Sequence, residues 1–307
     1  MSGPRLAERI KVPLKALRAS QPFNSVATVA VRGCLRWMGW HSEWVIRHLH
    51  RMGTVTAALP NGRTLRLWSR GDDWVSNQVF WRGWAGYEPE TAPVFFELAR
   101  RARITLDVGA YVGYYTLLAA HANPAGRVLA FEPLPTAHER LLRHVELNGL
   151  SNVECLAAAV AAAGGETDLL HVPGELPTSS SLSFEFMKGA GDLVRLRVPV
   201  LALDQFLRER GLAGVDLVKV DTESTEAEVL SGLADTLRRD RPWIVSEVLK
   251  GRGAEEPLAA LLGPLGYRYY LLTPEGPVER TALEGHPTWL NYLFVARGRE
   301  VPGRGVA

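Results

Sequence analysis

Residues 104–116 read ITLDVGAYVGYYT, and this stretch decides the fold of the chain. It begins as a short apolar run that ends at Asp107-Val108, turns through Gly109 and Gly113, and continues into a segment with helical spacing. A strand that passes through a glycine turn into a helix is typical of α/β domains that bind a nucleotide-like cofactor. The two glycines permit a sharp turn and allow a ligand to approach the backbone.

Asp107 and Glu132 indicate which class of cofactor the glycine turn would bind. A dinucleotide site would carry a further glycine where Tyr111 stands, and the acidic Asp107 before the turn suits a cationic amino group better than a pyrophosphate. Glu132 ends the next apolar run, residues 127–132, where a carboxylate can bind both hydroxyls of an adenosine ribose. The alternatives are a tight turn without a ligand and a solvated Glu132.

Outward from this stretch, short β-branched runs alternate with amphipathic segments. This cadence predicts a doubly wound α/β domain, with a seven-stranded, mostly parallel sheet and helices on both faces. The expected strands are 103–108, 127–132, 152–157, 215–220, 243–248, 267–272 and 291–296. The expected helices are 113–122, 136–148, 203–210, 224–238 and 255–263, and residues 171–192 read as a long loop.

The N-terminal part has a different character. Residues 1–50 carry eight Lys or Arg and two Asp or Glu, and apolar positions at roughly helical spacing begin within residues 5–20. We therefore expect a basic helical extension over 1–52, a hairpin and aromatic cap segment over 53–102, a cofactor-binding domain over 103–298 and a tail over 299–307. Helices packed on the catalytic domain or a partner subunit are preferred to a peripheral membrane-surface helix, which stays an alternative.

Composition excludes several classes of protein. The formal net charge of +2 gives no reason to expect a nucleic-acid partner, and the two cysteines form no Cys-x-x-Cys pair. The cysteine usage and the absence of a signal-like or 18-residue apolar stretch predict a cytoplasmic protein without a transmembrane segment. Homo-oligomer formation is left open.

The chain resembles the FkbM-type methyltransferase family through three ordered motifs. They are the glycine turn of residues 107–113, Phe131-Glu132-Pro133-Leu134-Pro135, and residues 219–226, which read KVDTESTE. Flanking matches at 80–83, 87–90 and 203–207 extend the resemblance over about residues 53–297. The resemblance implies a class I, Rossmann-like methyltransferase fold and S-adenosylmethionine as methyl donor. Two residues depart from the family pattern, since Tyr111 replaces an asparagine and Ser224 a glycine.

The family pattern also implies roles for individual residues. Asp107 and Gly109 would contact the methionine end of the cofactor, Glu132 the ribose, and Asp221 and Glu223 would border the methyl group and the acceptor. The full set of expected cofactor-binding residues is Glu88, Asp107, Gly109, Ala110, Gly113, Glu132, Pro133, Ala158, Ala159 and Asp221. Asp221, Glu223 and Glu247 are the candidate catalytic residues, one of which would act as the base. A divalent metal held by Asp221, Glu223 and Glu226 is conceivable, but none is predicted.

The function expected from these motifs is O-methylation of a hydroxyl on a small acceptor, such as a sugar or secondary metabolite. The alternatives are a glycan, lipid-linked or macromolecular acceptor, and a cofactor-binding homologue that has lost catalysis. A nucleic-acid amino-methyltransferase would show an Asn/Asp-Pro-Pro-aromatic segment, where this chain has Asp221-Thr222-Glu223-Ser224.

Overall fold

A computed structural model describes residues 20–39, 42–174, 176, 180–183, 187 and 191–303. The chain divides into two compact units, Met1–Tyr87 and Glu88–Ala307, and each is described here by itself. The helical spacing noted in residues 5–19 and the end of the expected tail, residues 304–307, lie outside the described residues.

The described part of the first unit combines three helices with a β-hairpin. The helices are α2 (Gln21–Trp37), α3 (Glu43–His48) and α4 (Trp74–Arg82), and the hairpin joins β1 (Met52–Ala58) to β2 (Thr64–Arg70). Alternate residues of both strands are buried, as the alternating apolar pattern of residues 53–68 predicts. Gly62 closes the hairpin with a φ of 80°, a conformation that favours glycine.

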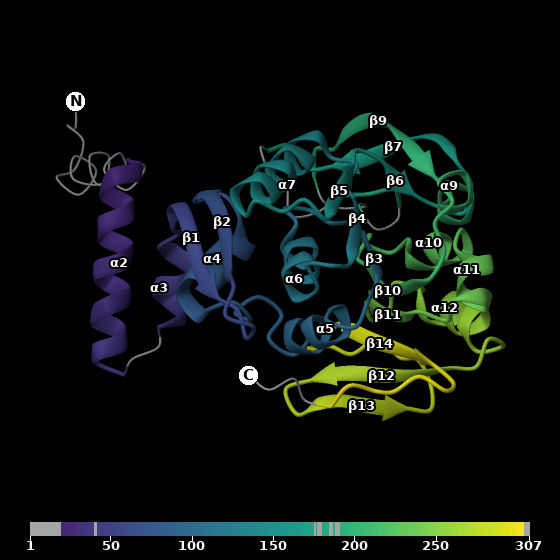
Figure 1. The fold of residues 1–307 in the computed structure, drawn as a ribbon. Helices are drawn as coiled ribbons and strands as arrows, with labels where there is room; N and C mark the ends of the chain where they lie inside the picture. The colour runs from purple at the N-terminus through teal and green to yellow at the C-terminus, as the bar shows by residue number, and fades with distance from the viewer. Residues whose placement is uncertain are drawn as a thin grey trace. The chain divides into compact units, whose positions relative to one another are not determined.

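The second unit is built on an eight-stranded sheet with the order β13-β12-β14-β11-β10-β3-β4-β5 (Figure 1). Strands β11, β10, β3, β4 and β5 are mutually parallel, and β14 runs antiparallel between β11 and β12. The strand bounds are β3 (Ile104–Val108), β4 (Arg127–Phe131), β5 (Val153–Leu156), β10 (Val215–Val220), β11 (Trp243–Glu247), β12 (Tyr267–Thr273), β13 (Gly276–Arg280) and β14 (Asn291–Ala296).

All seven strands expected from the sequence are present, but the expected strand count is one too low. The additional strand, β13, pairs with β12 at the edge of the sheet. It was missed because it contains Pro277 and most of its residues are exposed or half-buried, so it lacks an apolar run.

Helices cover both faces of this sheet (Figure 1). Figure 1 shows α5, α6 and α7 on one side of it and α9, α10, α11 and α12 on the other. Their bounds are α5 (Ala92–Ala99), α6 (Tyr114–Ala122), α7 (Pro135–Leu147), α9 (Leu203–Glu209), α10 (Glu226–Ser231), α11 (Ala234–Arg239) and α12 (Glu255–Leu262). The single helix expected over 224–238 is wrong, because it is divided into α10 and α11 at Gly232, whose backbone lies against the Ala161 carbonyl.

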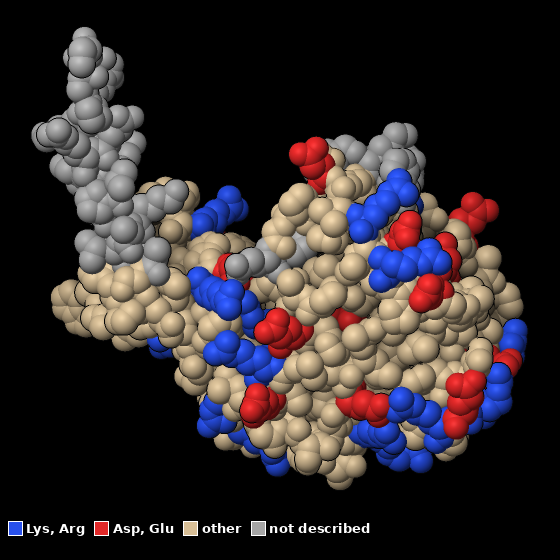
Figure 2. All heavy atoms as spheres, turned by 90° about the horizontal axis from the view of Figure 1, so that it is seen from above, with Lys and Arg blue, Asp and Glu red and all other residues tan. Residues whose placement is uncertain are grey.

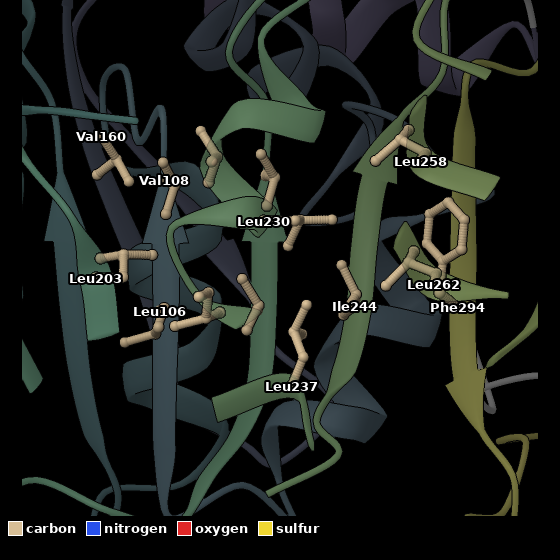
Figure 3. Close-up of a cluster of buried hydrophobic side chains, with 14 of the residues drawn as sticks. Leu106, Val108, Val160, Leu203, Leu230, Leu237, Ile244, Leu258, Leu262 and Phe294 are labelled. Atoms are coloured by element: carbon tan, nitrogen blue, oxygen red, sulfur yellow. The ribbon is translucent and has the colours of Figure 1, made fainter. Parts of the chain in front are cut away.

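One large part of the core lies between the sheet and the second group of helices. Figure 3 shows Leu106 and Ile244 of the sheet pointing toward Leu230, Leu237 and other apolar side chains of the helices. These four side chains are fully buried. Burial of this apolar surface stabilises the domain and holds the ends of the parallel strands at one edge.

A second, four-stranded sheet follows β5, with the order β6-β9-β7-β8. Its strands are β6 (Ala159–Val160), β7 (Gly165–His171), β8 (Ser180–Ser181) and β9 (Val194–Leu201). The sequence analysis did not predict it. Strand β7 reads GETDLLH and lacks an apolar alternation, whereas β9 reads VRLRVPVL and has one, but Pro199 within it is atypical of a strand. Exposed ion pairs such as Arg197 with Asp168, at 3.4 Å, join the two strands. The described residues of the expected loop 171–192 contain β8 and the end of β7, so that expectation is only partly correct.

The described surface seen in Figure 2 carries charges of both signs. Figure 2 shows Lys and Arg side chains interspersed with Asp and Glu over the face seen from above. The described part of that face therefore offers no broad field of one sign. None of the described helices combines the length and the apolar character needed to cross a bilayer.

Candidate functional site

The glycine turn after β3 brings two of the three sequence motifs together. Gly109 and Gly113 have φ values of 80° and 87°. A Cβ atom at Gly109 would overlap the backbone carbonyl of Asp221, and one at Gly113 would overlap the Leu141 side chain. Gly109 therefore lets the turn pack directly on the segment that follows β10. The expectation that these glycines also let a ligand approach the backbone stays a prediction.

Glu132 follows β4 and faces the same turn. One carboxylate oxygen accepts a hydrogen bond from the Tyr111 N–H at 2.7 Å, and the other from the Leu134 N–H at 2.8 Å. Burial raises the pKa of this carboxyl to about 7, although both backbone donors act to lower it. Each oxygen has a second lone pair that can accept a further donor. The geometry thus presents a positioned carboxylate beside the glycine turn.

Asp107 lies in β3 and is buried. It accepts a hydrogen bond from the Thr116 hydroxyl at 2.5 Å, and burial raises its pKa to about 6. Ala110 in the turn and Ala158 and Ala159 after β5 are also buried, and Pro133 follows Glu132 directly. The expected cofactor residues of β3, β4 and β5 therefore all lie at or just after the carboxyl ends of adjacent parallel strands.

Glu88 is the centre of a hydrogen-bond network that joins distant parts of the second unit. The carboxylate accepts a bond from the Tyr115 hydroxyl at 2.5 Å and from the Asn291 amide at 2.9 Å. Burial raises the pKa of Glu88. The side-chain carbonyl oxygen of Asn291 is buried and has no hydrogen-bond partner among the described residues. A buried acceptor of this kind is available for a donor of a ligand.

Lys219, in β10, is fully buried and lies beside this network. Its ammonium is 2.9 Å from an Asp221 carboxylate oxygen and 5.1 Å from the centre of the Tyr115 ring. Burial alone would lower the pKa of Lys219, but Asp221 and Glu88 outweigh that effect and raise it. Lys219 is therefore charged and compensates part of the acidic cluster.

The ends of β10 and β11 carry the remaining acidic side chains. Burial, with the charges of Asp221 and Glu226, raises the pKa of Glu223 to about 8. Burial, with Asp221 and Glu223, also raises the pKa of Glu247. The three candidate catalytic residues of the sequence thus lie near enough to influence one another. Because the pKa values of Glu223 and Glu247 are raised toward or above neutrality, these two carboxyls can exchange protons at physiological pH.

The two residues that depart from the family pattern share an unusual backbone conformation. Tyr111 and Ser224 both have positive φ values, 49° and 78°, a region that asparagine and glycine adopt more readily. Glu88 and Glu223 are also in this region, at 46° and 56°. Such strained backbone tends to occur at functional sites.

Ser224 does not form the N-cap of α10, although serine is a common N-cap residue. Thr225 precedes α10 instead, and the Ser224 hydroxyl is buried without a partner. The loop is held by Glu226, whose carboxylate accepts the Thr222 N–H at 3.2 Å and the Ser224 N–H at 3.0 Å. Glu226 is therefore a structural residue of this loop.

The sequence missed Tyr115 and Asn291 and did not assign Lys219 a role. Lys219 carried a signal, since it is the single charged residue in the apolar end of β10, and buried lysines are nearly always paired. No feature of the sequence near Asn291 points to this contact, because Asn291 lies 203 residues from Glu88 in the chain. Within the described part of the chain, no group of three His, Cys, Asp or Glu residues could hold a metal ion.

Comparisons with known proteins agree with this arrangement. A family model described as the methyltransferase FkbM domain matches residues 107–284. Methyltransferase sdnD of Sordaria araneosa is 29% identical over 188 residues, which cover 53% of this chain and 72% of that protein. The 31-O-demethyl-FK506 methyltransferase FkbM of Streptomyces tacrolimicus is 26% identical over 238 residues, which cover 69% of this chain and 88% of that protein.

Among solved structures, methyltransferase FkbM from Methylobacillus flagellatus aligns with a TM-score of 0.41 and 14% identity. The alignment covers 72% of this chain and 54% of that chain, so little more than half of that protein is matched.

Proposed function

Since the chain belongs to the FkbM methyltransferase family, we propose that it is an S-adenosylmethionine-dependent O-methyltransferase acting on a hydroxyl of a small acceptor. The observation that carries this proposal is the position of Glu132, which two backbone N–H groups hold beside the glycine turn. A carboxylate with lone pairs remaining on both oxygens matches the paired hydroxyls of a ribose.

The residues around the turn fit the rest of the cofactor. Asp107 and Glu88 offer negative charge to a cationic methionine end, and the unpartnered Asn291 oxygen offers an acceptor to an amino group. Ala158 and Ala159 provide a small apolar surface after β5 that suits the flat adenine ring. When bound, S-adenosylmethionine supplies a methyl group that its sulfonium already activates.

The protein's own task is then to align the acceptor, exclude water and remove a proton from the hydroxyl. Glu223 is our candidate for the proton acceptor, with Glu247 as the alternative, because burial and neighbouring acids raise the pKa values of both. Asp221 is less suited to this role because it is ion-paired with Lys219 at 2.9 Å, and we assign it to orientation of the site.

The proposed class of acceptor is based on the name of a relative. The Streptomyces tacrolimicus relative is named for methylation of 31-O-demethyl-FK506, a small molecule. We therefore favour a hydroxyl of a sugar or secondary metabolite over a glycan, lipid-linked or other macromolecular acceptor.

Two measurements test the proposal. Isothermal titration calorimetry with S-adenosylmethionine and S-adenosylhomocysteine should show binding of both, and an assay for S-adenosylhomocysteine should show transfer to hydroxyl-bearing metabolites. Absence of binding to either compound would refute the cofactor assignment. Binding without transfer to any hydroxyl acceptor, including glycans, would favour the cofactor-binding homologue without catalysis.

A further inference from the structure

Helix α2 packs on the first unit with its polar side and turns its apolar side outward (α2 in Figure 1). The side chains that it buries are polar, Asn24 and Thr28, at 5% and 0% exposure. The side chains on the opposite face are apolar, with Val26 72% and Trp37 89% exposed. In a soluble helix the apolar face is normally the buried one.

The outward face is continuous along the helix. Phe23, Val26, Ala30, Cys34 and Trp37 recur at spacings of three or four residues, and all five are exposed. Residues at these spacings lie on one side of a helix, one above another. Large exposed apolar residues on one stripe mark an interaction surface, whereas isolated ones are ordinary.

Hydrogen bonds on the inner face fix this orientation. The Asn24 side chain donates to the His50 carbonyl at 2.9 Å and accepts the Met52 N–H at 2.8 Å. Arg51 donates to the Thr28 hydroxyl at 3.0 Å, and Arg32 donates to the Phe80 carbonyl at 2.5 Å. Rotation of α2 to bury its apolar face would break these bonds and leave polar groups unpaired. The outward direction of the apolar stripe is thus built into the unit.

The charge of the neighbouring segment identifies the kind of surface that α2 would contact. Residues 1–19 carry five Lys or Arg and one Glu, whereas residues 51–307 carry 27 basic and 31 acidic residues. A tryptophan-bearing apolar face beside basic residues is the pattern of helices that lie in the interface of an anionic bilayer. The acidic remainder of the chain would be repelled by the same surface, which favours contact through this end.

The size of the face argues against a second copy of the chain. A helix of 17 residues is about 25 Å long and about 10 Å wide, so one face covers roughly 250 Å². A stable dimer buries about 800 Å² on each partner. Interfacial membrane binding has no such threshold, because it combines apolar burial with attraction to anionic lipids.

We propose that the outward face of α2 is a peripheral membrane-binding surface that inserts into the interface of an anionic lipid bilayer. The apolar stripe enters the boundary between headgroups and acyl chains, and the excess of basic over acidic residues in this part of the sequence favours an anionic surface. This places the enzyme on a membrane surface without a spanning segment. The inference is independent of the methyl-transfer activity.

Cys34 offers a direct probe of this face. It is exposed, whereas Cys155 is partly buried and burial raises the pKa of its thiol to about 11, which makes that thiol a poor nucleophile. In a Cys155→Ser variant, Cys34 can be labelled with an environment-sensitive fluorophore. We expect a blue shift on addition of vesicles of two parts phosphatidylcholine to one part phosphatidylglycerol, a smaller shift with phosphatidylcholine alone, and a loss of the shift at high salt.

Co-sedimentation of the full chain with the same vesicles gives the quantitative test. Phe23→Ser with Trp37→Ser should weaken binding by at least about tenfold, because two large apolar side chains no longer leave water. The matched control is Leu142→Ser with Val278→Ser, which removes two other exposed apolar side chains and should leave binding unchanged.

Three outcomes would overturn the proposal. One is the absence of vesicle binding in both experiments. A second is a blue shift without vesicles that disappears on dilution, which would identify a second copy of the chain as the occupant. The third is a concentration-independent blue shift without vesicles that disappears when residues 1–19 are deleted, which would show that this segment covers α2.

Discussion

The two halves of the sheet edge, β3 with β4 and β10 with β11, carry acidic residues in different environments. In the first half each carboxylate is held by protein donors, as Glu132 is by two backbone N–H groups and Asp107 by the Thr116 hydroxyl. Burial raises the carboxyl pKa values in both halves, and in the second half the charges of neighbouring acids raise those of Glu223 and Glu247 further. A carboxylate held by protein donors suits binding, and one with a pKa above neutrality suits proton transfer. The difference therefore supports our proposal that the first half binds the cofactor and the second the acceptor.

The largest expected effect comes from the cation between the two halves. Lys219→Met should destabilise the protein by about 3–5 kcal/mol, because Asp221 and Glu88 would lose their buried counter-charge. Urea denaturation measures this free energy of unfolding. The matched control, Lys250→Met at an exposed position, should change it by less than about 0.5 kcal/mol. A loss for Lys219→Met as small as that of the control would mean that the acidic half needs no counter-charge.

Glu132→Ala should weaken binding of S-adenosylmethionine and S-adenosylhomocysteine by about 1–3 kcal/mol, the usual cost of removing a charged hydrogen-bond partner. Calorimetry measures the affinity, and Glu139→Ala, at an exposed position of α7, is the control.

Glu223→Gln should instead slow methyl transfer while cofactor affinity stays the same. If Glu223→Gln weakened cofactor binding as much as Glu132→Ala, the division of roles between the two halves would be wrong.

The pH dependence of stability separates the halves in a second way. A carboxyl whose pKa is raised on folding stabilises the protein below its unfolded pKa, and this contribution is lost as pH rises through the folded value. The window is pH 4.5 to about 7 for Glu132 and pH 4.5 to about 8 for Glu223. We therefore expect stability to fall across these windows, by at most about 1.4 kcal/mol per pH unit for each group.

The matched variants distinguish the two contributions. Urea denaturation at a series of pH values should show that Glu223→Gln reduces the slope that persists from pH 7 to pH 8, where the contribution of Glu132 is already ending. Glu132→Gln should reduce the slope only below pH 7. Equal slopes in both variants would mean that the carboxyls of the two halves titrate alike.

The fold and the candidate site could be predicted from the sequence only in part. The seven expected strands are apolar runs, and the positions of Asp107, Glu132 and Asp221 follow because parallel strands end at one edge. The missed features differ in the local signal that they carry. Strand β9 has alternating apolar residues but contains Pro199, which is atypical of a strand, and β7 has few apolar residues. Asn291 has no local signal, because it reaches Glu88 only through the fold. The family resemblance identified Ser224 as unusual, but only the structure shows that its φ is positive.

The smallest expected effect concerns that residue. Ser224→Gly should stabilise the protein by about 0.5–1 kcal/mol, because glycine adopts positive φ without strain, and this gain exceeds its greater freedom in the unfolded chain. Ser231→Gly, within α10, should have the opposite sign because glycine is unfavourable in a helix. A shift of the urea midpoint at unchanged slope measures both. If Ser224→Gly destabilised the protein, the loop would not hold this residue at positive φ. A gain in stability together with slower methyl transfer would show that the strain at Ser224 helps to position Glu223, and would connect the strained loop to the acceptor half of the site.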